Sequence, residues 1–130
     1  MNNTMKAVIV DDEPHALLIF RKVLEWFEND IEIVGEANSL PSAISIISEK
    51  KPDVVFMDID MPNYSGLQIN DFFQSPRDFE IVFITAHSDY SIKALRIKAF
   101  DYLLKPLEVD ALKECYQRLK AQKKVSSNSS

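Results

Sequence analysis

Three carboxylates, one hydroxyl and one ammonium group follow the short apolar runs of this sequence. They belong to Asp11 and Asp12 after the first run, Asp58 after the second, Thr85 after the third and Lys105 after the fourth. The runs are rich in Val, Ile and Phe and do not alternate with polar residues, which predicts strands buried on both faces of a parallel sheet. Because ligands bind beyond the carboxyl ends of the strands in an open α/β sheet, these side chains are expected at one edge of it.

The chemistry that such a group could perform is phosphoryl transfer. Carboxylates that converge at neutral pH repel one another unless a cation intervenes, and a small number of oxygen ligands suits Mg²⁺. Asp58 is the candidate nucleophile, since a carboxylate oxygen can attack phosphorus to give an acyl phosphate. Lys105 could neutralise charge on the phosphoryl oxygens, and Thr85 could donate a hydrogen bond to one of them.

These residues also have ordinary structural interpretations. The Asp11-Asp12 pair could simply stabilise the N-terminus of a helix, although Asp58 opposite the pair argues against this. Lys105 could be merely solvated, although the proline that follows it can fix its direction. For Thr85, a role as a β-branched strand end fits the local sequence as well as a role as a donor.

Length, charge and cysteine content narrow the possible function classes. The 130 residues fit one domain with a single core. The formal net charge of −5 does not indicate the basic face typical of nucleic-acid binding. The single cysteine, Cys115, excludes an internal disulfide and suits a reducing compartment, and no apolar run approaches membrane-spanning length. We therefore expect a cytoplasmic domain that contacts neither nucleic acid nor a membrane.

Strands and helices are expected to alternate along the chain. Apolar runs predict strands over 6–10, 31–37, 54–57, 81–84 and 101–104. Helical spacing and start signals predict helices from Pro14, after Ser39, over about 67–73 and 90–98, and from Val109. In the loop over 61–66, Gly66 would take a positive φ angle. Five such β/α units imply a doubly wound α/β fold with a five-stranded parallel sheet.

The chain resembles response-regulator receiver domains in five ordered motifs. These are Asp11-Asp12, Asp58 with Met61-Pro62 and Gly66, Thr85-Ala86, Tyr102, and Lys105-Pro106. The resemblance covers about residues 5–121. It implies a flavodoxin-like fold with strand order 2-1-3-4-5, a receiver domain over 1–121, and a polar tail or the start of a linker over 122–130.

The resemblance also implies how the phosphoacceptor works. Asp58 would accept a phosphoryl group from a sensor histidine kinase, so the domain would be a signalling phosphoacceptor rather than an enzyme with turnover. Asp12, Asp58 and the backbone carbonyl of Asp60 would bind Mg²⁺, with Asp11 acting through water.

A switch to an output face is implied as well. Lys105, joined to Pro106 by a cis bond, would contact the phosphoryl group. Thr85 and Tyr102 would be the switch pair that alters the face formed by the fourth helix, the fifth strand and the fifth helix. A homodimer on phosphorylation would use apolar positions near that face, namely Ile92, Leu95 and Ile97.

Two further features refine this expectation. The segments 85–90 and 99–106 are similar to those of receivers coupled to LytTR DNA-binding domains, which implies control of transcription. Asp60 is acidic where many receivers have a neutral residue, and with His87 it would flank the path of hydrolytic water and so set the lifetime of the phosphoryl group. His87 and His15 are interpreted as solvated residues rather than phosphodonors.

Two other classes of protein share parts of the pattern. Asp58-Ile59-Asp60 resembles the aspartate motif of haloacid-dehalogenase-type phosphatases. These enzymes need a hydroxyl residue two places after the second aspartate, and neither Pro62 nor Asn63 supplies one. That motif would also lie on the first strand of such an enzyme. A flavin-binding module would need a phosphate-binding loop after the first strand, where this chain has acidic residues.

Overall fold

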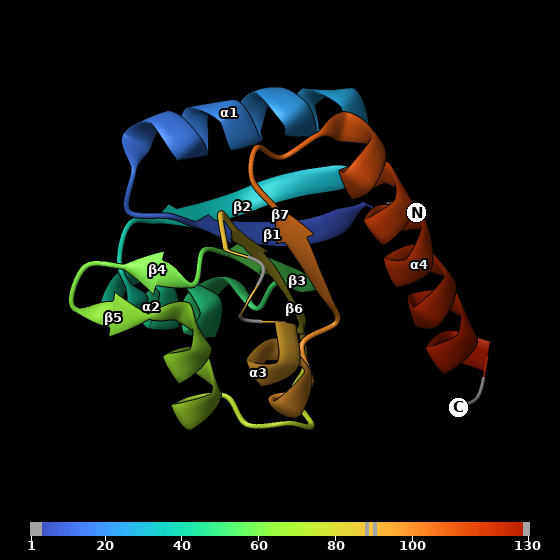
Figure 1. Ribbon diagram of the computed structural model, residues 1–130. Helices are drawn as coiled ribbons and strands as arrows, with labels where there is room; N and C mark the ends of the chain where they lie inside the picture. The colour runs from blue at the N-terminus through green and yellow to red at the C-terminus, as the bar shows by residue number, and fades with distance from the viewer. Residues whose placement is uncertain (1–3, 88, 90, 129–130) are drawn as a thin grey trace.

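A five-stranded parallel sheet forms the centre of the molecule in the computed structural model, which describes residues 4–87, 89 and 91–128, apart from the side chains of 91, 92 and 123–128 (Figure 1). Its strands are β1 (Met5–Val10), β2 (Ile31–Ala37), β3 (Val54–Met57), β6 (Glu80–Thr85) and β7 (Asp101–Leu104). They lie in the order β2-β1-β3-β6-β7. Counted among these strands alone, this is the predicted order 2-1-3-4-5, and the predicted fold class is confirmed.

Helices cover both faces of the sheet (Figure 1). One face carries α1 (Pro14–Leu24), the 3-10 helix η1 (Glu25–Phe27) and α4 (Val109–Asn128). The other carries α2 (Leu40–Lys50), the 3-10 helix η2 (Gly66–Asp71) and α3 (Ser91–Arg96). Successive residues of β1 divide between these faces, since Ala7 and Ile9 join the first cluster and Val8 and Val10 the second. The strand is therefore apolar on both sides, which explains its continuous apolar run.

The first two helices begin as the sequence predicts. Pro14 is the first residue of α1, where its missing N–H group costs nothing. The Ser39 hydroxyl accepts a hydrogen bond from the Ser42 amide (3.3 Å) and so caps α2.

The segment after β3 differs from the expected loop. It contains a short antiparallel pair, β4 (Asp60–Met61) with β5 (Tyr64–Ser65). The positive φ angle of this turn is at Asn63 (67°), and Gly66 does not have one. The prediction for Gly66 was therefore wrong, because asparagine also tolerates the left-handed region.

The last two helices differ from their predicted lengths. The described part of α3 begins at Ser91 and ends at Arg96, and the expected start at Tyr90 lies outside the described residues. Helix α4 continues to Asn128, although a polar tail was expected from Gln122. No Gly or Pro interrupts 109–128, and its lysines, glutamines and alanines are good helix formers. That the receiver domain ends at 121 stays a prediction.

Across the part of the chain that the structure describes, no helix combines the length and the apolar character needed to cross a bilayer.

Candidate functional site

The candidate site lies where the central strands end, and hydrogen bonds between the strands hold its residues in place. The Asp58 amide donates to the carbonyl of Val10 (3.0 Å), so the end of β3 is fixed to the end of β1. The Lys105 amide donates in the same way to the carbonyl of Thr85 (2.8 Å). The sheet therefore sets where the side chains of Asp58 and Lys105 begin.

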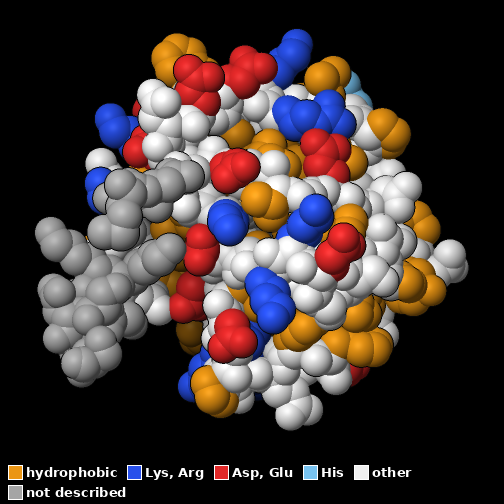
Figure 2. All heavy atoms as spheres, turned by 180° about the vertical axis from the view of Figure 1, so that it is seen from behind, with side chains coloured by type: hydrophobic (Ala, Val, Ile, Leu, Met, Phe, Trp, Pro, Cys, Tyr) orange, Lys and Arg blue, Asp and Glu red, His pale blue; other side chains and the backbone are white. Residues whose placement is uncertain are grey.

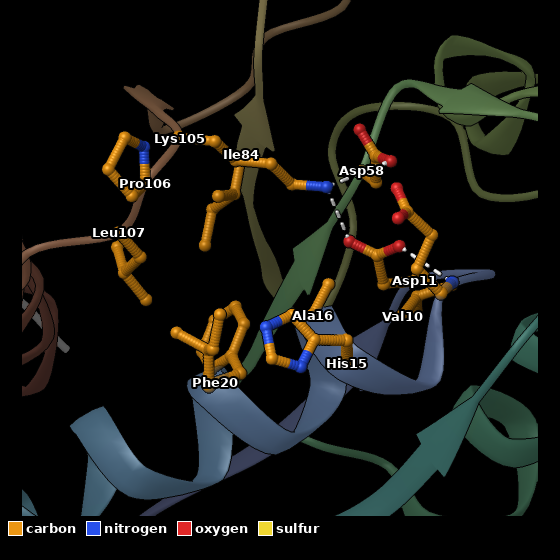
Figure 3. A pocket seen from close by; sticks show the side chains of 12 residues that line it. Val10, Asp11, His15, Ala16, Phe20, Asp58, Ile84, Lys105, Pro106 and Leu107 are labelled. Atoms are coloured by element: carbon orange, nitrogen blue, oxygen red, sulfur yellow. Dashed lines mark hydrogen bonds and ion pairs between the residues drawn. The ribbon is translucent and has the colours of Figure 1, made fainter.

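One ammonium group bridges two buried carboxylates at this edge (Figure 3). Lys105 Nζ donates to Asp11 Oδ2 at 2.8 Å and to Asp58 Oδ2 at 3.3 Å. Asp11 and Asp58 are only 4% and 5% exposed. The Lys105-Pro106 peptide bond is cis, as the resemblance implies. The predicted meeting of Asp11, Asp58 and Lys105 is thus present in the structure.

The pKa values reflect this crowding. Burial raises the pKa of Asp58 to about 6. The positive charge of Lys105 lowers this pKa, but the negative charge of Asp11 partly cancels that effect. Burial lowers the pKa of Lys105. Its hydrogen bond to Asp11 and the charges of Asp58 and Asp11 together outweigh burial, so the pKa of Lys105 is raised overall. At neutral pH, Asp58 is therefore an anion held next to a cation in a poorly hydrated position.

The backbone on the other side of Asp58 is packed closely. The Asp60 amide donates to Asp58 Oδ1 (3.3 Å), and the Gly66 amide donates to the carbonyl of Ile59 (2.7 Å). A Cβ atom on Gly66 would lie 2.2 Å from the carbonyl oxygen of Asp58. Gly66 is therefore required by this close approach, rather than by the positive φ angle expected from the sequence.

Carboxylate oxygens that could hold a metal ion gather just before α1. Carboxylate oxygens of Asp11, Asp12 and Glu13 all lie within 4.8 Å of one another. Burial raises the pKa of Asp12, and the charges of Asp11 and Glu13 add to that effect. Sequence reasoning omitted Glu13 as a candidate ligand, although its position directly after two aspartates was a signal. An all-oxygen, negatively charged donor set fits a hard cation such as Mg²⁺.

Thr85 and Tyr102 share the face of the sheet that carries α3. Thr85 is fully buried, and its Oγ1 accepts a hydrogen bond from the His87 amide (3.4 Å). Tyr102 is half-buried and pairs in register with Phe83, two residues before Thr85. Residues two apart on a strand point to the same face, so Thr85 and Tyr102 are positioned on one side.

A contact between side chains joins the two loops beside the site. His87 Nε2 lies 3.2 Å from Asp60 Oδ2, and these side chains are 60% and 43% exposed. The backbone amides of these two residues also donate hydrogen bonds at the site, that of Asp60 to Asp58 Oδ1 and that of His87 to Thr85 Oγ1. The sequence indicated that both residues flank the site, but their pairing could not be read from it.

An apolar cavity of about 330 Å³ adjoins Asp58 and Lys105 (Figure 3). Its apolar walls come from α1 and the segment after β7, and they include Ala16, Ile19, Phe20, Pro106 and Leu107. His15 lies at this cavity, as a residue of α1. The carboxylate of Asp58 is therefore reached along an apolar surface.

The family model of the response regulator receiver domain matches residues 7–117. The chain belongs to this family. The receiver is 44% identical over 119 residues to the transcriptional regulatory protein BtsR of Salmonella typhi, an alignment that covers 92% of this chain and 49% of that protein. It is 41% identical to BtsR of Escherichia coli, with the same coverage. The chain thus spans about half the length of the curated relatives it matches.

Solved receiver structures agree with the fold of this receiver. The receiver domain of AraT from Geobacillus stearothermophilus superposes with a TM-score of 0.84 at 28% identity, covering 95% of this chain and 98% of that one. The response regulatory domain of mrkE from Klebsiella pneumoniae gives 0.79 at 28% identity, covering 91% and 97%. The expected coupling of this receiver to a LytTR domain stays a prediction.

Proposed function

We propose that this receiver is the phosphoacceptor of a two-component phosphorelay and that Asp58 takes its phosphoryl group from a sensor histidine kinase. The bridge from Lys105 Nζ to both Asp11 and Asp58 is the observation that carries this proposal. A buried anion beside a half-buried cation, at the end of a strand and next to a cavity, suits attack on phosphorus.

In the proposed reaction, a carboxylate oxygen of Asp58 forms a bond to phosphorus as the bond from phosphorus to the kinase histidine nitrogen breaks. The electron pair of that bond leaves with the imidazole. The Lys105 ammonium group would stabilise the negative charge that moves from the carboxylate to the phosphoryl oxygens, because its Nζ already contacts Asp58 Oδ2. The receiver would catalyse only its own phosphorylation and slow dephosphorylation.

The acidic residues fit a divalent cation. Asp12, Asp58 and the backbone carbonyl of Asp60 would hold Mg²⁺, and Asp11 would act through water. Glu13 would add negative charge nearby, because its carboxylate lies close to those of Asp11 and Asp12. Mg²⁺ bound there would supply positive charge next to the phosphoryl oxygens.

Thr85 and Tyr102 are the proposed switch pair. The Thr85 hydroxyl can turn toward a phosphoryl oxygen when it gives up its long hydrogen bond from the His87 amide. This movement would leave space on the face where Tyr102 lies, and Tyr102 could rotate into it. Phosphorylation would thereby shift the population of the face formed by α3, β7 and α4.

That output face offers exposed apolar residues for a weak homodimer. Leu95 on α3 and Leu104 on β7 are 72% and 51% exposed. Ile97, which the sequence suggested for the same role, is half-buried and packs against the core. The side chain of Ile92, also suggested, lies outside the described residues.

The proposed output is control of transcription by a domain elsewhere in the full-length protein. Curated relatives of the receiver are transcriptional regulatory proteins about twice its length. On the face that Figure 2 shows, Lys and Arg side chains are interspersed with Asp and Glu and form no continuous basic patch. The mixed charge of this face fits a receiver that does not use it to contact nucleic acid. We propose that the receiver acts in the cytoplasm, where a sensor histidine kinase would present its phosphoryl group.

Incubation with acetyl phosphate and Mg²⁺, followed by intact-mass spectrometry, tests the proposal. The parent chain should gain one phosphoryl group, and it should gain none in EDTA. Asp58→Asn keeps the shape of the side chain and removes the attacking anion, so undiminished labelling of this variant would refute the assignment.

A further inference from the structure

The guanidinium of Arg77 joins two elements that are far apart in the sequence. Arg77 lies in the segment between η2 and β6 and is half-buried. Its Nη2 donates to the carbonyl oxygens of Ile97 (2.7 Å) and Lys98 (3.1 Å), directly after α3. Its Nη1 donates to the carbonyl of Phe73 (3.0 Å) and to Asn70 Oδ1 (3.4 Å), at the end of η2.

The carbonyls of Ile97 and Lys98 belong to the C-terminal end of α3. Lys98 has a φ angle of 63°, and the amides of Lys98 and Ala99 donate back into the last turn of the helix (3.0 and 3.1 Å). The final carbonyls of a helix have no partner within it, and a positive charge next to them is favourable. Arg77 therefore caps α3 from outside, through a side chain that η2 also holds.

The same contacts connect α3 to the backbone of the phosphoacceptor. Helix η2 begins at Gly66, which packs directly against the carbonyl of Asp58. The opposite end of α3 follows the loop after Thr85, where His87 donates to the Thr85 hydroxyl. One end of α3 is thus fixed to the Asp58 side of the domain, and the other end follows the proposed switch residue.

We propose that Arg77 is a positioning residue. Its hydrogen bonds, called the pin below, hold the C-terminal end of α3 against η2, so that α3 rotates about this end. A shift of Thr85 then appears as displacement of the N-terminal turn of α3 and of the loop before it. Without the pin, the same shift would be spread over the whole helix. The part that concerns phosphorylation rests on the proposed function, whereas the pin itself does not.

Hydrogen exchange of the unliganded protein tests the pin. In Arg77→Gln, the amides of Lys98 and Ala99 should exchange about tenfold faster or more, which is the factor expected when hydrogen bonds to a charged group are lost from a local opening. Amides of β1 and β3 should change far less. Arg77→Lys keeps the charge but reaches fewer acceptors, and it should fall between Gln and the parent. Arg21→Gln breaks an exposed pair with Glu36 and serves as the matched control.

The same variants are then compared with and without beryllofluoride and Mg²⁺. In the parent, exchange should change in the loop after Thr85 and at the start of α3, but not at Lys98 and Ala99. In Arg77→Gln the change should extend to these two amides, while phosphoryl uptake by Asp58 stays at the parent rate.

Two results would overturn the proposal. Exchange at Lys98 and Ala99 that is unchanged in Arg77→Gln would mean that no pin exists. An equal increase in the exchange rate at every protected amide would mean that Arg77 stabilises the whole fold and does not hold α3 specifically. If Arg77→Gln did not fold, the same comparison would be made with Arg77→Lys. If beryllofluoride and Mg²⁺ did not change hydrogen exchange in the parent protein, the proposed function would be refuted. The comparison of the unliganded proteins would still show whether the pin exists.

Discussion

Replacing Asp58 by Asn should make the metal-free protein more stable at neutral pH, although it removes the proposed nucleophile. Burial raises the pKa of Asp58 from its usual 3.8 to about 6. Because the folded pKa lies above the unfolded one, folding favours the protonated acid. The stability that this provides is complete below about pH 4 and is lost as the pH rises through about 6.

The size of the effect follows from that shift. About two pKa units correspond to about 3 kcal/mol, and the attraction of Lys105 is already included in the shift. Asn keeps an acceptor oxygen for Lys105 and removes the charge, so the gain at pH 7.5 should be about 2–3 kcal/mol. For a domain of this size, that is a rise of roughly 10 °C in Tm.

Thermal melts in EDTA at pH 7.5 and pH 4.0 measure this. The gain of Asp58→Asn should be present at pH 7.5 and nearly absent at pH 4.0, where the parent acid is largely protonated. Asp71→Asn removes the same charge from an exposed position and should change Tm little at either pH. A variant no more stable than the parent at pH 7.5, or a gain of equal size at pH 4.0, would show that the buried charge does not destabilise the fold.

Four other changes have specific expected outcomes. Gly66→Ala places a Cβ atom against the Asp58 carbonyl, so it should lower Tm and slow phosphoryl uptake, as melts and mass spectrometry can measure. Lys105→Met removes the cation that lowers the pKa of Asp58, so uptake from acetyl phosphate should be slower and its pH profile should move to higher pH; an unmoved profile would contradict this. His87→Gln removes the imidazole that contacts Asp60 beside the site and should change the lifetime of the acyl phosphate, measured by its decay after removal of the donor; an unchanged lifetime would contradict this role. Leu104→Lys should abolish the beryllofluoride-dependent dimer in sedimentation, and a dimer that persists would exclude this part of the output face.

The central part of the site could be predicted because it depends only on strand order. Asp58 directly follows the buried strand β3 and Lys105 directly follows β7, a partly exposed strand at the edge of the sheet. Parallel strands bring both positions to one edge. The bridge from Lys105 to Asp11 and Asp58 follows from this arrangement. The helix starts at Pro14 and Ser39 could be predicted because they rest on local patterns. The strand order was implied by the resemblance to receiver domains, and the structure confirms it.

The remaining details depend on contacts between segments that are distant in the sequence. The reason for Gly66 is its approach to the Asp58 carbonyl, which no local pattern encodes. The pairing of Asp60 with His87 and the four hydrogen bonds of Arg77 likewise join loops whose relative position only the packed fold determines.

Locating the phosphoryl group on the chain tests the central claim most directly. After incubation with acetyl phosphate and Mg²⁺, reduction with borohydride converts an acyl phosphate into a stable product that peptide mass spectrometry can assign to one residue. We predict modification at Asp58 alone and none in Asp58→Asn. A phosphoryl group found on His15 or His87, or one retained by the Asp58→Asn variant, would contradict the assignment of this site.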